Sequence, residues 1–516
     1  MTPRLAVILM LLAIRPAAGA TTCATLASAA LPGTTITRAQ LVPAGRFAST
    51  TDGVLAPGAA AFKPYSALPE FCRVAATLTP SADSDIKIEV WMPATGWNGR
   101  FQAIGNGAWA GALMIQPLAV ALGRGYAVTT TDTGHTERDG SFAFSHPEKL
   151  VDFADRAVHL MATQAKALIG AFYSKPPVAS YWTGCSTGGR QGLIEAQRYP
   201  ADFDGIVAGD PTNDMTHMFL QQMWVTKVAL ANSAGGFSKE KAAVLHQAVV
   251  DACDARDGVR DGVIDDPTRC AFDPAALLCK TGDGPACLTE GEVATARAMY
   301  DTARNARTGV EVFPGFAKGS EAGWPGLIGG PKPFNVPEDF FKFVVFKNPA
   351  WNFRTLNMDT DVARAEAADG GRMDATDPDL SAFVARGGKL LMYHGWSDPL
   401  VSPQNSVNYY ERVARLLGSA LRVSDSVRLF MAPGMSHCAG GDGPSNFDSL
   451  NLVEQWVEQK IAPDQIVASH LTGGKVDRTR PLCPYPQLAV YRGTGDTNDA
   501  ASFVCRQPNR SMRRER

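Results

Sequence analysis

Three residues far apart in the chain have the types that nucleophilic attack on a carbonyl requires. Residues 184–189, with the sequence GCSTGG, match the pattern G-x-S-x-G, in which small residues permit a sharp turn from strand to helix that exposes a serine hydroxyl. A serine hydroxyl is too weakly acidic to attack unaided, so it needs a base, usually a histidine held by a carboxylate. Because glycine-rich turns are common, Ser186 is a candidate nucleophile only together with such partners.

The partners follow in the chain order of α/β-hydrolases, which is serine, then aspartate or glutamate, then histidine. Asp398 comes after an expected strand at 389–393, and His437 comes after an expected strand at 426–431. Each alone fits a turn residue or a loop histidine, but their joint placement after successive strands favours a triad. We predict Ser186 as nucleophile, His437 as base and Asp398 as the carboxylate that orients the base.

Two other histidines, His135 and His394, also lie near strand ends and are the rival bases. His135 precedes the serine, which is the wrong order for this fold, and His394 lies only four residues before the predicted carboxylate. Both are therefore expected to be hydrogen-bonded structural groups that line the site.

Acyl transfer also needs an oxyanion hole, which in this fold is made by the amide after the nucleophile and by an amide from an early loop. Thr187 follows the serine directly. Residues 105–108, with the sequence GNGA, follow an expected strand at 100–104, and their lack of large side chains lets a backbone amide approach a substrate. We predict the amides of Gly107 and Thr187 as the two donors, against a plain glycine turn.

The elements that must position these residues alternate between strand and helix. Apolar spacing predicts helices at 151–172 and 188–197. Short apolar runs bounded by Gly, Pro or Asp predict strands at 86–91, 100–104, 126–130, 178–183, 205–208, 389–393 and 426–431. Such alternation predicts an α/β fold with a mostly parallel sheet covered on both faces.

The alternation stops near residue 210 and resumes near residue 387. We therefore predict a catalytic domain of residues 21–210 and 387–516, of the α/β-hydrolase fold, with a large inserted domain of residues 211–386, hereafter the insertion. Because ligands bind outside the carboxyl ends of the strands, an insertion that leaves one of those ends is expected to cover the site as a lid.

Residues 1–20 have the basic start, short apolar run and small-residue end of a secretory signal peptide. The apolar run is too short to span a membrane, and no later segment is long and apolar enough. We predict a secreted or periplasmic protein. The 516 residues carry a formal charge of −2 with no basic run in the interior, so nucleic acid is a poor candidate partner. The sequence makes no prediction of oligomeric state.

Export to an oxidising compartment and an even set of ten cysteines predict five disulfides. The sequence does not fix their connectivity, but local spacing favours three pairs, and the two cysteines nearest the mature N-terminus plausibly form a fourth. That leaves Cys185, which precedes Ser186, to pair with Cys438, which follows His437. Such a bond would tether the nucleophile loop to the base loop. The pairs favoured are Cys23–Cys72, Cys185–Cys438, Cys253–Cys270, Cys279–Cys287 and Cys483–Cys505.

Residues 254–266, hereafter the acidic loop, lie between Cys253 and Cys270 and have the sequence DARDGVRDGVIDD. Clustered carboxylates, glycines that allow tight turns and available carbonyls suit a hard cation with many oxygen ligands, which favours Ca²⁺ over a merely solvated acidic loop. The spacing copies an EF-hand only in part. We predict a structural calcium site that stabilises the insertion.

At these residues the sequence resembles the tannase and feruloyl esterase family of α/β-hydrolases, which also includes mono(hydroxyethyl)terephthalate hydrolases. The resemblance runs through nearly the whole mature chain, and its most specific segments are 184–192, 254–267, 346–351, 394–399 and 436–438. It implies the Cys185–Cys438 disulfide. It also implies calcium bound by the side chains of Asp254, Asp257 and Asp261 and by the carbonyls of Val259 and Val263.

The predicted function is a serine carboxylic ester hydrolase that acts on esters of small aromatic acids, most of all hydroxycinnamate (feruloyl) esters. Hydrolysis of gallate esters or of terephthalate monoesters are the alternatives within enzymes, and a noncatalytic binding protein is the alternative from another class. Lid residues set the substrate in the family, so Lys342 and Phe346 are candidate substrate contacts, although packing inside the lid explains them equally well.

Overall fold

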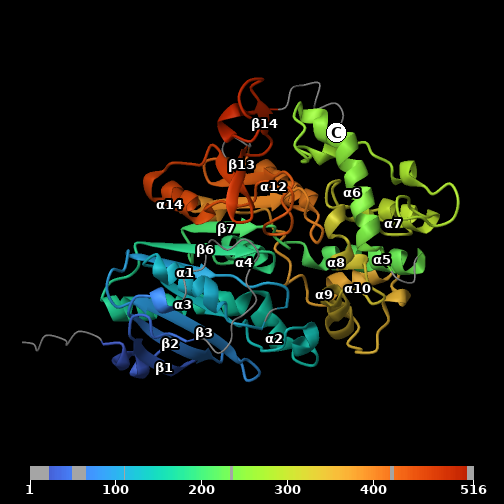
Figure 1. Ribbon diagram of the computed structural model, residues 1–516. Helices are drawn as coiled ribbons and strands as arrows, with labels where there is room; N and C mark the ends of the chain where they lie inside the picture. Colours follow the sequence, from blue (N-terminus) through green and yellow to red (C-terminus); the bar gives the residue numbers. More distant parts are fainter. Residues whose placement is uncertain (1–21, 49–64, 110, 233–235, 419–422, 508–516) are drawn as a thin grey trace, which may run out of the picture.

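The computed structural model describes residues 22–48, 65–109, 111–232, 236–418 and 423–507, so the predicted signal peptide at 1–20 lies outside it. A single nine-stranded sheet crosses the molecule (Figure 1), in the order β1-β2-β3-β5-β4-β6-β7-β10-β11. Its strands are β1 Thr34–Val42, β2 Phe71–Leu78, β3 Ile86–Pro93, β4 Arg100–Ile104, β5 Ala127–Thr131, β6 Ala179–Cys185, β7 Gly205–Gly209, β10 Lys389–Gly395 and β11 Val427–Ala432.

The six strands from β5 to β11 along this order run parallel, as the alternation of elements predicted. All seven predicted strands are present with ends shifted by at most two residues. The strands β1, β2 and β3 add an antiparallel edge. The first two had no counterpart in the sequence prediction. Because the carboxyl ends of the parallel strands β6, β7, β10 and β11 meet at one edge, the loops that follow them are neighbours in space.

Helices cover both faces of the sheet, and the buried side chains separate into two clusters accordingly. On one face, α3 (Ala157–Tyr173), α4 (Thr187–Arg198) and α12 (Pro403–Leu416) pack with alternate strand residues. On the other face, α1 (Ile115–Gly123) and α14 (Ser449–Gln459) do the same. The predicted helix at 151–172 is found as α2 (Pro147–Val151), a wide π turn and α3. Buried parallel strands need this double cover.

The insertion lies between β7 and β10, which are hydrogen-bonded neighbours in the sheet. Figure 1 shows its helices grouped on one side of the molecule, away from β1 and β2. Its aromatic side chains share a core with Trp109, Phe142 and Phe153 of the sheet-bearing part. Its elements are α5 Met215–Asn232, α6 Lys239–Cys253, α7 Glu290–Tyr300, β8 Ala303–Arg304, β9 Glu311–Phe313, α8 Pro325–Ile328, α9 Asn335–Asp339, α10 Asp361–Ala367 and α11 Ser381–Ala385.

Beyond α14 the chain forms two small antiparallel pairs that the sequence did not predict, β12 (Ile466–Thr472) with β13 (Lys475–Leu482) and β14 (Leu488–Tyr491) with β15 (Phe503–Arg506). The five disulfides of the structure are the five pairs that spacing favoured, with Cα–Cα distances of 5.0 to 5.9 Å. In the described ranges, no helix is long and apolar enough to cross a membrane.

Candidate active site

Ser186 occupies a sharp turn between β6 and α4. Its backbone has φ 62° and ψ −123°, a conformation that non-glycine residues rarely adopt. Its N–H donates to the carbonyl of Gly209 at 2.9 Å, and its own carbonyl accepts from the N–H of Arg190 at 3.0 Å. These bonds hold the strained residue at the start of the helix, which is the nucleophile-elbow geometry that the glycine-rich motif predicted.

The turn is possible only because glycines allow three pieces of backbone to approach closely. A Cβ atom at Gly184 would lie 2.4 Å from the carbonyl oxygen of Gly188, and one at Gly105 would lie 2.7 Å from the Cα of Gly188. The residue types around the serine are therefore fixed by the path of the backbone.

The loop at 105–108 lies directly beside this turn. The N–H of Gly188 donates to the carbonyl of Asn106 at 2.8 Å, and the hydroxyl of Thr187 donates to the carbonyl of Ala108 at 2.9 Å. No hydrogen bond to the backbone N–H of Gly107 or Thr187 is present among the described residues, and a Cβ at Gly107 would meet nothing within 4 Å. The loop that carries Gly107 thus packs against the turn that carries Thr187, and neither backbone N–H has an acceptor among the described residues.

Asp398 and His437, which are 39 residues apart, are hydrogen bonded, with 2.7 Å between Asp398 Oδ2 and His437 Nδ1. Asp398 is fully buried and the His437 side chain is 17% exposed. Because Nδ1 is engaged by the carboxylate, Nε2 is the nitrogen of His437 that remains for a serine hydroxyl. The disulfide between Cys185 and Cys438, with 5.9 Å between the Cα atoms, joins the residue that precedes Ser186 to the residue that follows His437.

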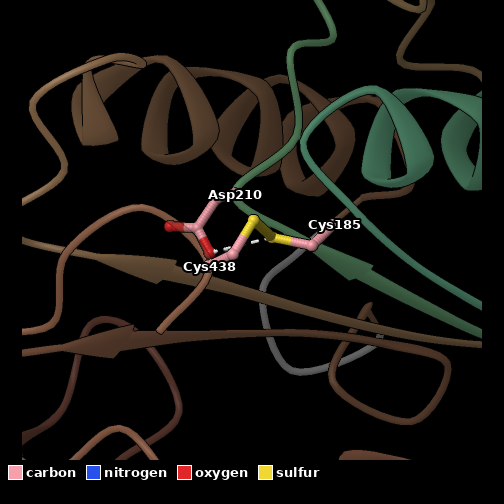
Figure 2. A group of neighbouring side chains, drawn as sticks. All are labelled: Cys185, Asp210 and Cys438. Carbon is pink, nitrogen blue, oxygen red and sulfur yellow. Dashed lines mark hydrogen bonds between the residues drawn. A yellow bond between two sulfur atoms is a disulfide. The ribbon is translucent and has the colours of Figure 1, made fainter. Parts of the chain in front are cut away.

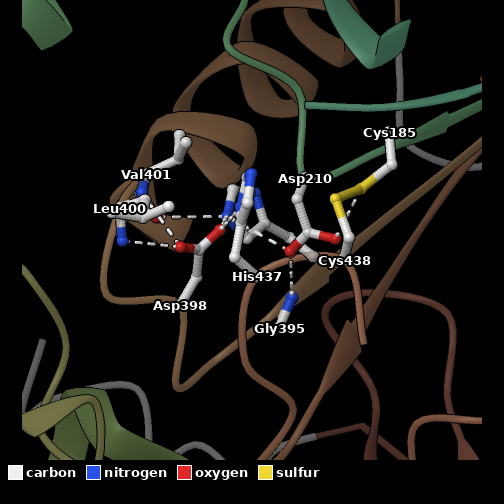
Figure 3. Close-up of a disulfide and its surroundings, with 9 residues drawn as sticks. Cys185, Asp210, Gly395, Asp398, Leu400, Val401, His437 and Cys438 are labelled. Carbon is white, nitrogen blue, oxygen red and sulfur yellow. Dashed lines mark hydrogen bonds and ion pairs between the residues drawn. A yellow bond between two sulfur atoms is a disulfide. The ribbon is translucent and has the colours of Figure 1, made fainter. Parts of the chain in front are cut away.

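Asp398 accepts four hydrogen bonds in all (Figure 3). Its Oδ1 accepts from the N–H groups of Leu400 and Val401 at 2.8 and 3.0 Å, and its Oδ2 accepts from His394 Nε2 at 3.2 Å besides His437. His394 Nε2 also faces the carbonyl of Val401 at 3.2 Å, and because a carbonyl can only accept, this nitrogen carries the proton. His394 is therefore a buried donor to Asp398, as the sequence interpretation of a structural group expected.

The charges of the pair support each other. Burial alone would raise the pKa of Asp398, but the charge of His437 and the hydrogen bonds from both histidines bring this pKa well below its usual value. Burial would lower the pKa of His437, but the charge of Asp398 and the hydrogen bond between them bring it above its usual value. The carboxylate is thus ionised and the imidazole is a strong base.

A second buried carboxylate, Asp210, lies beside this pair. Figure 2 shows it against the disulfide, with Oδ2 at 3.4 Å from the Sγ of Cys185. Its Oδ1 accepts from the N–H of Gly395 at 2.9 Å and lies 3.7 Å from His394 Nε2. Asp210 follows β7 directly and has a positive φ of 35°. In the sequence this residue marks only the boundary between the catalytic domain and the insertion.

Comparison with known proteins identifies the architecture. The model of the family "Tannase and feruloyl esterase" matches residues 72–506. The chain belongs to the tannase and feruloyl esterase family. It is a carboxylic ester hydrolase of the α/β-hydrolase fold, so the alternative of a noncatalytic binding protein is not retained.

Relatives of this tannase and feruloyl esterase family member cover most of its length. It is 38% identical to an uncharacterized esterase of Xanthomonas campestris pv. campestris, over 95% of this chain and 92% of the relative. It is 34% identical to a probable feruloyl esterase B of Aspergillus clavatus, over 92% and 93%. The crystal structure of feruloyl esterase B from Aspergillus oryzae matches with a TM-score of 0.85 and 30% identity, over 94% of this chain and 99% of that one.

In this family member the acidic loop follows α6 and is closed by the Cys253–Cys270 disulfide. Asp254 accepts from the N–H groups of Asp261 and Gly262, both at 3.2 Å, and Asp257 accepts from the N–H of Val259 at 2.9 Å. Burial raises the pKa of Asp257 to about 6. The loop is therefore folded on itself by hydrogen bonds from its own backbone N–H groups to its carboxylates.

Asp257, Asp261 and Asp265 line one small cavity together with Arg480 from β13, whose guanidinium bonds to Asp261. Hard oxygen donors on a short, disulfide-closed loop fit a divalent cation in chemistry. The close groups of three candidate ligands found in the described part of the chain do not include this loop. A cation would have to draw the carboxylates together and displace Arg480 from Asp261.

The two predicted substrate contacts have partners inside the insertion. Lys342 Nζ lies 2.9 Å from a carboxylate oxygen of Glu338. The ring of Phe346 stacks on Trp351 at 5.3 Å between centroids, and the guanidinium of Arg364 lies 4.9 Å from its centroid. The structure does not bring either residue into a hydrogen bond or ring contact with the Ser186, Asp398 and His437 group.

Proposed function

We propose that Ser186, His437 and Asp398 form the catalytic triad of this ester hydrolase. The single observation that carries the proposal is the His437–Asp398 hydrogen bond in a loop that a disulfide ties to the residue before Ser186. Convergence of an elbow serine, a buried imidazole–carboxylate pair and two unused amides at one sheet edge suits acyl transfer and little else.

In the first step the Oγ of Ser186 bonds to the ester carbonyl carbon while its proton passes to Nε2 of His437. The carbonyl oxygen takes up the negative charge and accepts hydrogen bonds from the N–H groups of Gly107 and Thr187. The tetrahedral intermediate then expels the alcohol, which takes the proton from His437. Water attacks the acyl-enzyme by the same route and releases the acid, and Asp398 stabilises the imidazolium in both halves.

The proposed substrates are esters of small aromatic acids, first of all feruloyl and other hydroxycinnamoyl esters. Support comes from the names of two relatives, a probable feruloyl esterase B at 34% identity and feruloyl esterase B from Aspergillus oryzae at 30% identity. A tannin acyl hydrolase from Aspergillus niger is only 22% identical, so its likeness speaks for the fold alone. Gallate esters and terephthalate monoesters remain the alternatives to test.

The deciding experiment compares hydrolysis of methyl ferulate, methyl p-coumarate, methyl gallate and mono(hydroxyethyl) terephthalate by the wild type and by Ser186→Ala. We expect methyl ferulate or methyl p-coumarate to be the best substrate, and the alanine variant to lose about 10⁴-fold or more in kcat/KM. Retained activity in Ser186→Ala would refute the triad. Cleavage of only the gallate or terephthalate ester would refute the substrate class while leaving the triad intact.

The proposed location is outside the cytosol, either secreted or periplasmic. Five disulfides in the described residues are typical of proteins that fold in an oxidising compartment. The signal-peptide pattern at 1–20 agrees with export. Expression in the native host followed by fractionation and N-terminal sequencing tests this, with a mature start at Thr21 as the expected result.

We also propose a structural calcium ion in the acidic loop, held by the side chains of Asp254, Asp257 and Asp261 and the carbonyls of Val259 and Val263. Bound there, Ca²⁺ would neutralise part of the negative charge of these clustered carboxylates and would stabilise the insertion. The chemistry at Ser186 takes no step through the ion.

A further inference from the structure

Asp210 is a buried titratable side chain to which the triad mechanism gives no task. It has no exposed surface, and its carboxyl group is in contact with three segments that carry the site. These are Cys185 at the end of β6, Gly395 at the end of β10 and, across the disulfide, Cys438 after β11. Figure 3 shows it between the disulfide and the histidine pair.

The backbone at this position is also held in an uncommon conformation. The φ of 35° lies in the left-handed region, and the N–H of Asp210 donates to the carbonyl of Tyr393 at 2.9 Å. Asp and Asn tolerate this region better than other side chains, while glycine enters it freely. The end of β7 thus holds the Asp210 carboxylate in a fixed position beside the disulfide.

The charged groups that act on Asp210 are all members of the site. His394 and His437 favour its ionised form, whereas burial and the charge of Asp398 oppose it, and together these raise its pKa to about 6. The same interaction acts in the other direction, because the negative charge of Asp210 raises the pKa of His437.

We propose that Asp210 is a positioning residue of this esterase that acts through His437: its carboxylate adds to the charge of Asp398, makes the imidazole a stronger base and so sets the lower pH limit of activity. The proposal rests on the triad assigned under Proposed function. Two buried carboxylates thus stabilise the imidazolium of His437. Asp398 does so by a direct hydrogen bond, and Asp210 does so by its negative charge without a hydrogen bond to His437.

The test is the pH profile of kcat/KM with 4-nitrophenyl acetate, an activated ester that does not depend on acyl preference. In Asp210→Asn the amide oxygen still accepts from Gly395 N–H, and asparagine keeps the backbone conformation, so only the charge is lost. We expect the acid limb of the profile, which reports His437 in the free enzyme, to move down by about one pH unit. Activity above this limb should fall several-fold because the imidazolium is less stabilised.

Asp210→Gly removes the whole side chain at a φ that suits glycine and should give the same shift, so the result does not depend on one variant folding. The matched control is Asp374→Asn. Burial also raises the pKa of Asp374 to about 6. Its carboxylate accepts from the N–H of Thr216, which is not a residue of the site. Its limb should coincide with that of the wild type.

If Asp210→Asn and Asp210→Gly both lose activity evenly at every pH with an unmoved limb, the residue is merely structural and the proposal is wrong. Ser186→Ala, measured in parallel, separates this failure from failure of the triad. If Ser186→Ala is inactive and the acid limb of the Asp210 variants does not move, only the proposed role of Asp210 is wrong. If Ser186→Ala is active, the triad on which that role rests is wrong.

Discussion

The side chain of Asp398 and those of the acidic loop are carboxylates that lie out of solvent to a large extent, but they differ in the hydrogen-bond donors around them. Asp398 accepts from two backbone N–H groups and two histidines, which bring its pKa below the usual value. In the acidic loop, burial raises the pKa of Asp257 to about 6 and that of Asp265 to about 8. Burial alone favours the neutral acid, and the number of donors decides whether a carboxylate keeps its charge. The donors around Asp398 therefore keep it ionised, whereas Asp257 and Asp265 of the acidic loop ionise only at a higher pH.

The largest effect expected from this comparison follows removal of the charge at Asp398. Asp398→Asn offers an amide in place of a carboxylate and leaves His437 in the wrong tautomer, so kcat should fall about 10⁴-fold with the fold intact. Steady-state kinetics on the best ester of the panel, with circular dichroism as the check of folding, measures this. A loss of less than tenfold would mean that another group orients His437.

Chelation of calcium should act on stability and leave the chemistry alone. Treatment with EGTA is expected to lower Tm by several degrees, because the proposed Ca²⁺ would bind only the folded loop. Added CaCl₂ should restore the wild type, while Asp257→Asn should start from the lower Tm and respond to neither. Scanning calorimetry measures the shift, with Asp374→Asn as the matched variant outside the loop. An unchanged Tm after EGTA would contradict the calcium site.

Substitutions of His394 test the role of the donors around Asp398, because His394 supplies one of the four. His394→Leu removes this donor and should lower kcat/KM about tenfold, the cost of one hydrogen bond to a charged group. His394→Gln can still place an N–H near the carboxylate and should retain most of the activity. Equal losses in the two variants would show that the shape of the side chain matters and its hydrogen bond does not.

The smallest expected effect is the pH dependence of stability without metal. The pKa values of Asp257 and Asp265 are raised in the folded protein, so their contribution to stability is fully present below about pH 4. It is lost as pH rises to about 6 for Asp257 and to about 8 for Asp265. The calcium-free enzyme should therefore lose roughly a few degrees of Tm between pH 5.5 and 8.5. Saturating CaCl₂ should reduce this loss. A metal-free Tm that rises over the same interval would contradict the raised pKa values.

Much of the site could be predicted because its signals are local. The turn at 184–189 can be recognised by the glycines that the backbone path requires. Asp398 and His437 can be recognised because they follow the apolar runs that form β10 and β11. Contacts made by residues of ordinary type gave no such signal. Ser406, which meets His394 Nδ1 at 2.7 Å, lies on α12 with nothing in its neighbourhood to mark it. A histidine next to the carboxylate was visible in the sequence, but its donor role needed the positions of both nitrogens.

The sequence by itself determined the parallel sheet, the glycine-rich turn around Ser186 and the family, because glycine placement, apolar periodicity and motif order are properties of neighbouring residues. It favoured the five cysteine pairs, and the structure established them. Only the tertiary structure decided which charged groups from distant parts of the chain lie close enough to interact. It placed Asp210 against the disulfide and the histidines, and it brought Arg480 of β13 to Asp261, 219 residues away. Such electrostatic partnerships depend on distances of a few ångströms between segments that the fold alone brings together.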